Sequence, residues 1–469
     1  MRINKKIVLP LLWFATHVAT AQTSRTAINS WVTTTNRDSL FKQQKQFLIF
    51  GKATANKNPT IEINEKQTYQ TMDGFGFALT GGSAMHIIKM APASRTSLLK
   101  DLFATDGNSI GVSYLRVSIG ASDLNDKVFS YDDLPAGETD KGMQKFSLGP
   151  DTADVIPVLK EILAINPGIQ ILGSPWSPPT WMKTNNDTRG GRLKPEFYTA
   201  YANYFVKYIQ SMKAAGIAID AITIQNEPLH PGNNPSLLLP APDEAEFIKN
   251  HLGPAFKAAN IKTKIIIYDH NADRPDYPIT ILNDTAAAKY IDGSAFHLYG
   301  GDIENLAPVH EAYPNKNLYF TEQMVVEKPG SKQIDIRWPV KHLLIGATRN
   351  WCRIVLLWNL AADPQNKPFT DRGGCDACQG AVTIDSNKFT RNAAYYVIAH
   401  AAKFIRPGSV RIASNELDAL PNVAFKTPQG KKVLIVLNNS NTAQAFNISY
   451  NGLIVNAALS AGAISTYEW

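Results

Sequence analysis

Eight short apolar segments alternate with stretches long enough to form helices through most of this 469-residue chain. The apolar segments are rich in β-branched and aromatic residues, as is typical of strands that are buried on both faces. Eight alternating strand and helix units predict an α/β fold, a (β/α)8 TIM barrel of parallel strands. We expect the strands at residues 74–78, 113–119, 169–176, 219–227, 264–270, 293–299, 317–323 and 353–360.

An open, doubly wound sheet is the alternative arrangement of the same pattern. Sheets of that kind that bind dinucleotides carry a Gly-x-Gly-x-x-Gly turn between an early strand and its helix. The glycines at Gly74, Gly76, Gly81 and Gly82 do not have that spacing. A dinucleotide cofactor is therefore not supported, and the closed barrel is favoured.

The two ends of the chain have a different texture from the middle. After residue 405 the helical stretches stop, and short strands separated by Asn, Gly and Ser turns predict a β-sandwich domain. This module lacks a strand or two, which the alternating pieces before residue 66 could supply. We therefore expect residues 22–68 to contribute N-terminal strands to the sandwich, residues 69–404 to form the catalytic barrel, and residues 405–469 to form the rest of the sandwich.

The first 21 residues resemble a secretory signal peptide. Arg2, Lys5 and Lys6 precede an apolar run at residues 7–15, and small residues follow at positions 19–21. The run is too short for a permanent membrane anchor, and no Cys follows it to accept a lipid. We expect a secreted or periplasmic protein that is a monomer and has no stable membrane anchor.

Charge and cysteine content exclude further classes. The formal charge of +7 includes the three signal-peptide cations, and the other basic residues are scattered, so nucleic acid is not an expected partner. Cys375 and Cys378 form a single C-x-x-C pair, which is weak evidence for zinc or redox chemistry. This pair could form a disulfide that braces a small loop, or it could remain as two free thiols. Cys352 lies in an apolar run and is predicted to be a small buried hydrophobic residue.

Two strands end in glutamate, and these residues are the strongest functional signal. The strand at 219–227 ends in Gln225-Asn226-Glu227-Pro228, and the strand at 317–323 ends at Glu322 and Gln323. A single glutamate at a strand end is more often a solvated loop residue or an arginine partner. In a barrel, however, the carboxyl ends of the strands meet at one mouth, and hydrolysis of a glycosidic bond requires two carboxyls.

Other strand ends carry groups suited to a sugar. Aromatic rings pack on the apolar faces of sugars, and carboxylates, amides and imidazoles bond their hydroxyls. The candidate rings are those of Trp176, Trp181, Tyr299 and Trp358, and the candidate polar groups are those of Asp123, Asn226 and His297. Each ring alone could equally be a core residue, and Arg116, Asp269 and His270 also stand at strand ends.

Two other chemistries are weakly supported. His297 has no second His at helical spacing beside a Glu, so a metal site is not expected. Ser174 and Ser177 do not lie in Gly-x-Ser-x-Gly, which argues against a serine esterase. We therefore expect neither a metal nor another cofactor.

Several segments resemble a known family, the glycoside hydrolases of family 30, which includes glucosylceramidases and endo-β-1,6-glucanases. The resemblance runs in order from about residue 71 to the C-terminus. One departure is the stretch after the first strand, where Ala-Leu-Thr-Gly-Gly-Ser-Ala stands in place of a frequent Thr-Asp-Ala and resembles the bacterial glucanase branch. The similar segments begin at Met72, Tyr114, Leu172, Thr223, Ala295, Phe320 and Leu357.

The resemblance implies a barrel with a side β-sandwich and a reaction that retains anomeric configuration. It implies Glu227 as the general acid/base and Glu322 as the nucleophile, about 5–5.5 Å apart. We expect burial and the charge of Glu322 to raise the pKa of Glu227. The implied sugar contacts are Asp123, Trp176, Asn226, His297, Tyr299 and Trp358.

The expected function is that of a secreted retaining hydrolase of β-glucan oligo- or polysaccharides, specifically an endo-β-1,6-glucanase. A glucosylceramidase is the alternative within the same chemistry. A non-catalytic carbohydrate-binding protein and a metal-dependent hydrolase are the alternatives from other classes.

Overall fold

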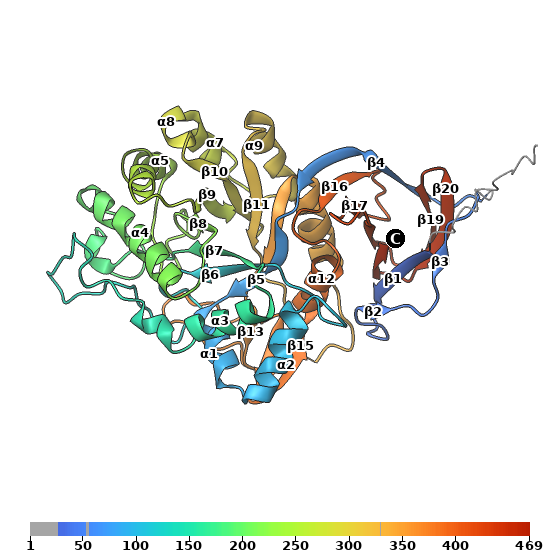
Figure 1. The fold of residues 1–469 in the computed structure, drawn as a ribbon, viewed down its shortest axis with the longest axis horizontal. Coiled ribbons are helices and arrows are strands. Elements are labelled where there is room, and N and C mark those ends of the chain that lie inside the picture. Colours follow the sequence, from blue (N-terminus) through green and yellow to red (C-terminus); the bar gives the residue numbers. More distant parts are fainter. Residues whose placement is uncertain (1–26, 53–55, 329) are drawn as a thin grey trace, which may run out of the picture.

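A computed structural model describes residues 27–52, 56–328 and 330–469 (Figure 1). The predicted signal peptide lies outside these residues. The described chain forms a barrel with helices around it and, beside it, a body built of strands. No helix among the described residues has both the length and the apolar character needed to cross a membrane.

Within the described residues, eight parallel strands close into the predicted barrel, in the order β10-β11-β12-β5-β6-β7-β8-β9. Each strand overlaps the segment expected from the sequence. The strands are β5 (Gly74–Leu79), β6 (Tyr114–Ser118), β7 (Gln170–Ser174), β8 (Ala221–Thr223), β9 (Lys264–Asn271), β10 (Ile291–His297), β11 (Asn317–Glu322) and β12 (Cys352–Leu357).

Side chains fill the interior of the barrel. Tyr114, Leu172, Ile266, Tyr319 and Leu356 belong to one buried cluster contributed by strands from around the barrel. Because the interior is packed, a substrate can reach the reacting groups only at a mouth, and in barrels of this type that is the mouth at the carboxyl ends of the strands.

Helices cover the outside of the barrel, and their apolar faces explain their positions. In α3, Val155, Val158, Leu159 and Ile162 recur at helical spacing and are buried, and Asp154 caps the first turn by accepting the N–H of Val155. The α-helices are α1 (Gly81–Lys89), α2 (Pro92–Phe103), α3 (Val155–Ile165), α4 (Tyr198–Ala214), α5 (Ala241–Phe247), α6 (Gly253–Ala258), α7 (Asp276–Asn283), α8 (Thr285–Ala288), α9 (Ala307–Ala312), α10 (Arg337–Pro339), α11 (Ala347–Arg349) and α12 (Ala393–Ala402).

Shorter helical segments complete these layers. Two are π-helical and continue α5 and α10 without a break, and the others are 3₁₀ turns. They are η1 (Gly149–Thr152), η2 (Thr180–Met182), η3 (Pro195–Phe197), η4 (Ile248–Leu252), η5 (Ile303–Leu306) and η6 (Val340–Gly346).

A small sheet after β12 was not predicted from the sequence. It comprises β13 (Ala361–Ala362), β14 (Val382–Asp385) and β15 (Lys388–Arg391). Because β13 follows β12 directly, the long connection between β13 and β14 starts at the carboxyl end of the barrel. This connection, residues 363–381, is called the β13–β14 loop below.

The second body is the predicted β-sandwich, built from both ends of the chain. The N-terminal β1 pairs with the C-terminal β21, and β4 lies between β16 and β19, so neither end forms the sheet alone. Ile28, Ile61, Leu434 and Phe446 pack in its core. Its strands are β1 (Ala27–Thr33), β2 (Lys42–Gln43), β3 (Leu48–Ile49), β4 (Thr60–Thr71), β16 (Val410–Ser414), β17 (Asn422–Lys426), β18 (Lys432–Leu437), β19 (Gln444–Tyr450), β20 (Leu453–Leu459) and β21 (Ile464–Glu468).

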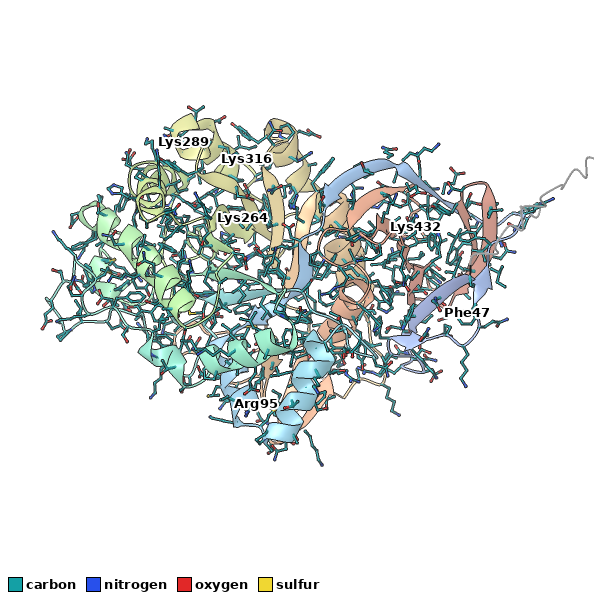
Figure 2. The ribbon with its side chains drawn as sticks, viewed as in Figure 1. Phe47, Arg95, Lys264, Lys289, Lys316 and Lys432 are labelled. Atoms are coloured by element: carbon teal, nitrogen blue, oxygen red, sulfur yellow. A yellow bond between two sulfur atoms is a disulfide. The ribbon has the colours of Figure 1, made fainter. Side chains whose placement is uncertain are left out.

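Helix α12 joins the two bodies, since it contacts both β5 and β21. Its His400 is fully buried, and the two ring nitrogens lie 2.9 Å from the hydroxyls of Thr33 and Thr466. Away from this junction the sandwich carries exposed apolar side chains, among them Phe47 at its outer edge (Figure 2). These buried contacts of α12 hold the sandwich against the barrel.

Candidate active site

A cavity of about 250 Å³ opens at the carboxyl ends of the barrel strands. Five of the residues expected in a sugar site line it, and seven further residues complete the wall. The expected residues are Asp123, Glu227, Tyr299, Glu322 and Trp358, and the others are His230, Asn233, His270, Asn271, Met324, Cys375 and Cys378.

Glu227 follows β8, which leaves the ladder after Thr223. Its backbone has φ +46°, a left-handed conformation that is strained for a residue other than Gly. The N–H of Glu227 donates to the carbonyl of Asp269 at 3.0 Å, and its carbonyl accepts the N–H of His230 at 2.8 Å. These bonds hold the strained turn, and the carboxyl is directed into the cavity.

Glu322 is the last residue of β11, and it is 5% exposed. Its carboxylate accepts a hydrogen bond from the guanidinium of Arg116 and, at 3.0 Å, one from the hydroxyl of Tyr299. A carboxylate oxygen of Glu227, a ring nitrogen of His297 and a carboxylate oxygen of Glu322 all lie within 4.8 Å of one another. The two predicted glutamates, distant in sequence, therefore face each other across the cavity.

Arg116 lies beneath the two glutamates and is fully buried. It donates to Asp269 at 2.8 Å and to the side-chain oxygen of Asn226 at 2.7 Å, in addition to Glu322. Burial disfavours its charge, but the charges of Asp269 and Glu322 outweigh burial and keep the pKa of Arg116 above its usual range. Arg116 therefore holds Asn226 and Glu322 in fixed positions.

Asp269 is the other half of this buried ion pair. It follows Tyr268 in β9, where both residues have positive φ values, +74° for Tyr268 and +59° for Asp269. Besides Arg116, its oxygens accept bonds from Ser174 and Thr223, both at 2.7 Å. Burial alone would raise its pKa, yet Arg116 and His297 hold the pKa of Asp269 well below the usual range.

His297 connects Asp269 to Glu227. Its Nε2 lies 3.0 Å from Asp269 and its Nδ1 lies 3.2 Å from Glu227, and the ring is fully buried. Although burial disfavours the cation, the charges of Glu322, Asp269 and Glu227 raise the pKa of His297 to about 9. At neutral pH His297 is an imidazolium that donates to Glu227 from Nδ1 and to Asp269 from Nε2.

The expected direction of the pKa shift of Glu227 was wrong for the ligand-free protein. Burial opposes its charge, but the hydrogen bond and positive charge of His297 outweigh burial and hold the pKa of Glu227 below its usual range. Burial raises the pKa of Glu322, while His297 and Arg116 act in the opposite direction. Sequence reasoning had missed the cation beside Glu227.

Two stacked indoles support the apolar side of the site: Trp358 lines the cavity, and Trp176 lies behind it. The rings of Trp176 and Trp358 stack with centroids 5.4 Å apart, and the guanidinium carbon of Arg116 lies 4.8 Å from the centroid of the Trp176 ring. The Nε1 of Trp176 is buried and has no partner among the described residues. Trp181, in contrast, donates its Nε1–H to the carbonyl of Asp132 at 3.0 Å, a structural contact.

Asp123 and Tyr299 line the same cavity as Glu322. Burial, with the charges of Glu322 and Glu227, raises the pKa of Asp123 to about 8, so its carboxyl is protonated at neutral pH and can donate a hydrogen bond. Tyr299 is 39% exposed, and its backbone N–H donates to the side-chain oxygen of Asn271 at 3.0 Å. The Tyr299 ring thus stands at the mouth with its hydroxyl on Glu322.

The structure therefore brings the predicted site residues together in one place, except Trp181, whose indole donates to the carbonyl of Asp132 instead. Trp176, Asn226 and His297 are not part of the cavity surface and lie directly behind it, bonded to or stacked on residues that are. Sequence reasoning did not select the other wall residues for the site. His270 and Asn271 could have been found because they end β9, and the C-x-x-C pair because it follows β12.

Comparisons with known proteins agree with this geometry. The family model for the glycosyl hydrolase family 30 TIM-barrel domain matches residues 72–405, and the model for the family's beta sandwich domain matches residues 408–467. The chain is 36% identical over 377 residues to the endo-1,6-beta-D-glucanase of Neurospora crassa, covering 77% of each protein.

Two further relatives extend the comparison. The lysosomal acid glucosylceramidase of Mus musculus is 30% identical over 467 residues, covering 92% of this chain and 88% of that protein. The solved structure of the endo-beta1,6-glucanase BT3312 superposes with a TM-score of 0.86 at 34% identity, covering 95% of this chain and 99% of that one.

Proposed function

The chain belongs to glycosyl hydrolase family 30, and from that premise we propose that it is a retaining endo-β-1,6-glucanase that acts by double displacement. The observation that carries this proposal is the short distance between Glu227 and Glu322, which have carboxylate oxygens within 4.8 Å of each other. Retaining enzymes hold their two carboxyls about 5–5.5 Å apart, whereas inverting enzymes leave about 6.5–9.5 Å for a water molecule.

In the first step Glu322 attacks the anomeric carbon and forms a covalent glycosyl-enzyme, while Glu227 protonates the departing glycosidic oxygen. Arg116 and Tyr299 hold the carboxylate of Glu322 by hydrogen bonds, so the nucleophile is oriented before the substrate arrives. In the second step Glu227 removes a proton from water, and the oxygen of that water displaces Glu322.

The proton that Glu227 needs is stored on His297. In the ligand-free site His297 is protonated and Glu227 is ionised, 3.2 Å apart. Transfer of the proton from Nδ1 of His297 to Glu227 produces the acid, and Asp269 on the opposite nitrogen fixes the ring for that transfer. His297 thus supplies Glu227 with this proton, and because Glu227 ends the second step protonated by water, the proton returns to Nδ1 of His297 when the product leaves.

Asp123, Trp176, Asn226 and Trp358 form the binding site for the sugar whose bond is cleaved. The protonated carboxyl of Asp123 can donate to its hydroxyls, and the ring of Trp176 stacks on Trp358 and supports it from behind. The ring of Trp358 forms an apolar surface for its C–H face. Asn226 is oriented by Arg116, which bonds its side-chain oxygen and leaves its NH₂ free for a sugar oxygen.

The polar wall around Glu227 supports a glucan rather than a lipid-linked glucose as the proposed substrate. His230, Asn233, His270 and Asn271 surround the acid, and Asn233 lies 3.5 Å from it. Burial lowers the pKa of His270 to about 4, so its ring is neutral at working pH. A departing sugar can bond such groups, whereas the apolar chains of a ceramide gain nothing from them. The glucosylceramidase activity of the mouse relative is therefore the second candidate.

Anomeric NMR during hydrolysis of a linear β-1,6-glucan tests this proposal. We expect release of β-configured oligosaccharide ends before mutarotation, no cleavage by the Glu322→Gln variant, and slower cleavage of glucosylceramide than of the glucan. Initial release of the α-anomer would exclude double displacement, and faster glucosylceramide cleavage would favour the second candidate. Binding of the glucan without any cleavage would indicate the non-catalytic alternative.

We also propose that the protein is exported as a monomer after removal of residues 1–21. Support comes from the charge, apolar run and small residues of that segment in the sequence. N-terminal sequencing of the protein recovered from the medium or periplasm is the test, and the expected first residue is Gln22. Size-exclusion chromatography with light scattering tests the oligomeric state.

A further inference from the structure

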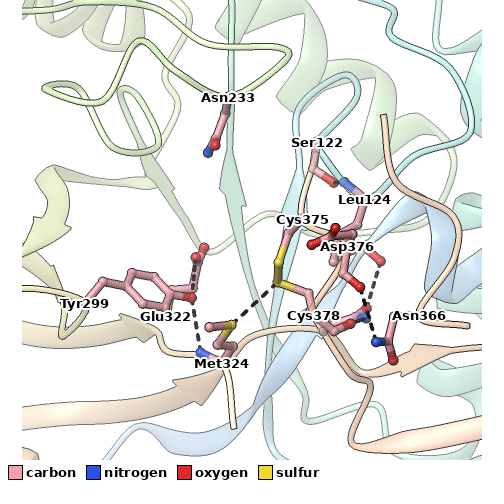
Figure 3. The surroundings of a disulfide bond; sticks show 12 residues. Ser122, Leu124, Asn233, Tyr299, Glu322, Met324, Asn366, Cys375, Asp376 and Cys378 are labelled. Atoms are coloured by element: carbon pink, nitrogen blue, oxygen red, sulfur yellow. Dashed lines mark hydrogen bonds between the residues drawn. A yellow bond between two sulfur atoms is a disulfide. The ribbon is translucent and has the colours of Figure 1, made fainter. Parts of the chain in front are cut away.

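The β13–β14 loop closes one side of the cavity, and it carries a disulfide bond between Cys375 and Cys378. Both half-cystines belong to the cavity wall. Figure 3 shows Met324 next to the disulfide, with Glu322 and Tyr299 on the far side of Met324. Of the two possibilities left open by the sequence, the structure contains the disulfide and not the free thiols.

The disulfide lies against Met324, which follows Glu322 in the chain, and its turn is bonded to Asn359, which follows Trp358. The Sγ of Cys378 lies 3.9 Å from the Sδ of Met324, which is two residues after Glu322. Cys378 is 3% exposed and packs in one cluster with Trp176 and Trp358. Its carbonyl accepts the side-chain amide of Asn359 at 2.9 Å, so the turn is fixed to the end of β12.

The same loop holds Asp123 in place. The N–H of Thr370 donates to the Asp123 carbonyl at 2.9 Å. Asp123, Cys375 and Cys378 line the same cavity, and Asp123 makes no side-chain hydrogen bond to another side chain of the described residues. The position of its carboxyl therefore depends on the loop that the disulfide braces.

We propose that the Cys375–Cys378 disulfide is a positioning element of the sugar-binding site, which keeps in place the loop that holds Asp123. Opening the disulfide gives the backbone of the turn more conformational freedom, and ordering it again opposes sugar binding. A dithiol reductant supplies two electrons and two protons, which give two thiols and the oxidised reductant. The inference rests on the proposed function only in that Asp123 binds the sugar.

Steady-state kinetics of the full chain with and without dithiothreitol test the proposal, with β-1,6-linked gluco-oligosaccharides as substrate. A thiol assay confirms that two more thiols are present after reduction. We expect kcat/KM to fall about tenfold, mainly through KM, because one well-placed hydrogen bond to a sugar is weakened. Unchanged kinetics after complete reduction would overturn the proposal.

Two cysteine variants control for the reductant. The Cys375→Ser/Cys378→Ser double variant should have the low kcat/KM of the reduced protein and should not respond to dithiothreitol. Cys352→Ala removes a buried cysteine of β12 and should respond as the wild type does. A response of the double variant would show that the reductant acts elsewhere, which would contradict the proposal.

A coupling measurement separates positioning from a purely structural role. In an Asp123→Asn variant kcat/KM is already lower, and we expect reduction to change it less than twofold further. An additional tenfold loss in that background would show that the disulfide does not act through Asp123. Loss of far-UV circular dichroism on reduction would assign the disulfide to stability of the fold and would also overturn the proposal.

Binding to an inactive variant makes the inference independent of the proposed reaction. Gluco-oligosaccharide titrated into Glu322→Gln should change the emission of Trp176 and Trp358, and we expect a weaker Kd after reduction. If the oxidised wild type hydrolyses no β-glucan, the proposed function fails, and this titration still tests the disulfide. Equal Kd values for the two redox states would reject the disulfide's role alone.

Discussion

The charge on His297 should make the free energy of unfolding depend on pH, and the His297→Asn substitution should remove this dependence. The ordinary pKa of the ring is 6.5, and its carboxylate neighbours raise the pKa to about 9 in the folded protein. Each unit of difference corresponds to about 1.4 kcal/mol, so protonated His297 stabilises the fold by roughly 3 kcal/mol.

The sign of the effect follows from the direction of the shift. Because the folded protein holds this proton more tightly than the unfolded chain, the stabilisation is complete below pH 6.5. It decreases as the pH rises and is lost above about pH 9. The His297→Asn variant lacks the titrating ring and should lack this loss.

The assay is chemical unfolding by urea, followed by tryptophan fluorescence, at pH values from 6 to 9.5. The quantity compared is the difference in free energy of unfolding between wild type and His297→Asn, because titrating groups remote from the site are unchanged in the variant and cancel. We expect this difference to shrink by roughly 3 kcal/mol between pH 6 and pH 9.5.

His400 provides a matched control. It is also fully buried, but its ring lies between two hydroxyls, and burial lowers its pKa to about 3. It is therefore neutral throughout the range above pH 6.5, and the destabilisation by His400→Asn should not change from pH 7 to 9.5. A His297→Asn difference that is equally flat would refute the assignment of an imidazolium at the active site.

Three other predictions concern the same site. Arg116→Met should lower the free energy of unfolding at pH 7 by about 3–5 kcal/mol, because it leaves the buried charge of Asp269 without its main partner; a loss below 1 kcal/mol in urea would contradict this. Trp176→Phe should lower kcat/KM about tenfold, because the smaller ring no longer supports Trp358, whereas Trp181→Phe should destabilise the protein by about 1 kcal/mol with unchanged kcat/KM, as kinetics and unfolding of both variants will show. The acid limb of the pH–kcat/KM profile should have its midpoint above pH 4.5, since burial raises the pKa of Glu322 in the free enzyme, and a midpoint below that value would argue against this carboxyl as the nucleophile.

Much of the barrel was predictable because its signals are local. A strand buried on both faces must be apolar throughout, and a helix on the outside must be apolar on one face, so both leave a pattern in consecutive residues. The interruption of such a strand by Asn226 and Glu227 was visible for the same reason. The family resemblance, which the comparisons confirm, depended on these strand ends.

The electrostatics of the site were not predictable in the same way. Arg116, Asp269 and His297 each appeared at a strand end, but no local pattern shows that three separate strands bring them into contact. The direction of the Glu227 pKa shift depends on this contact, and it was predicted with the opposite sign. The small sheet formed by β13, β14 and β15 was missed because its strands are only two to four residues long.

By itself, the sequence of this protein determined the eight-unit barrel, the strand-built second body and the two glutamates at the mouth, because each depends on residue types within one short segment. Only the tertiary structure decided the charge of His297, the orientation of Asn226 by Arg116 and the disulfide beside Asp123. These features depend on distances between residues far apart in the chain, and burial magnifies their effect, since charges and hydrogen bonds removed from water interact more strongly.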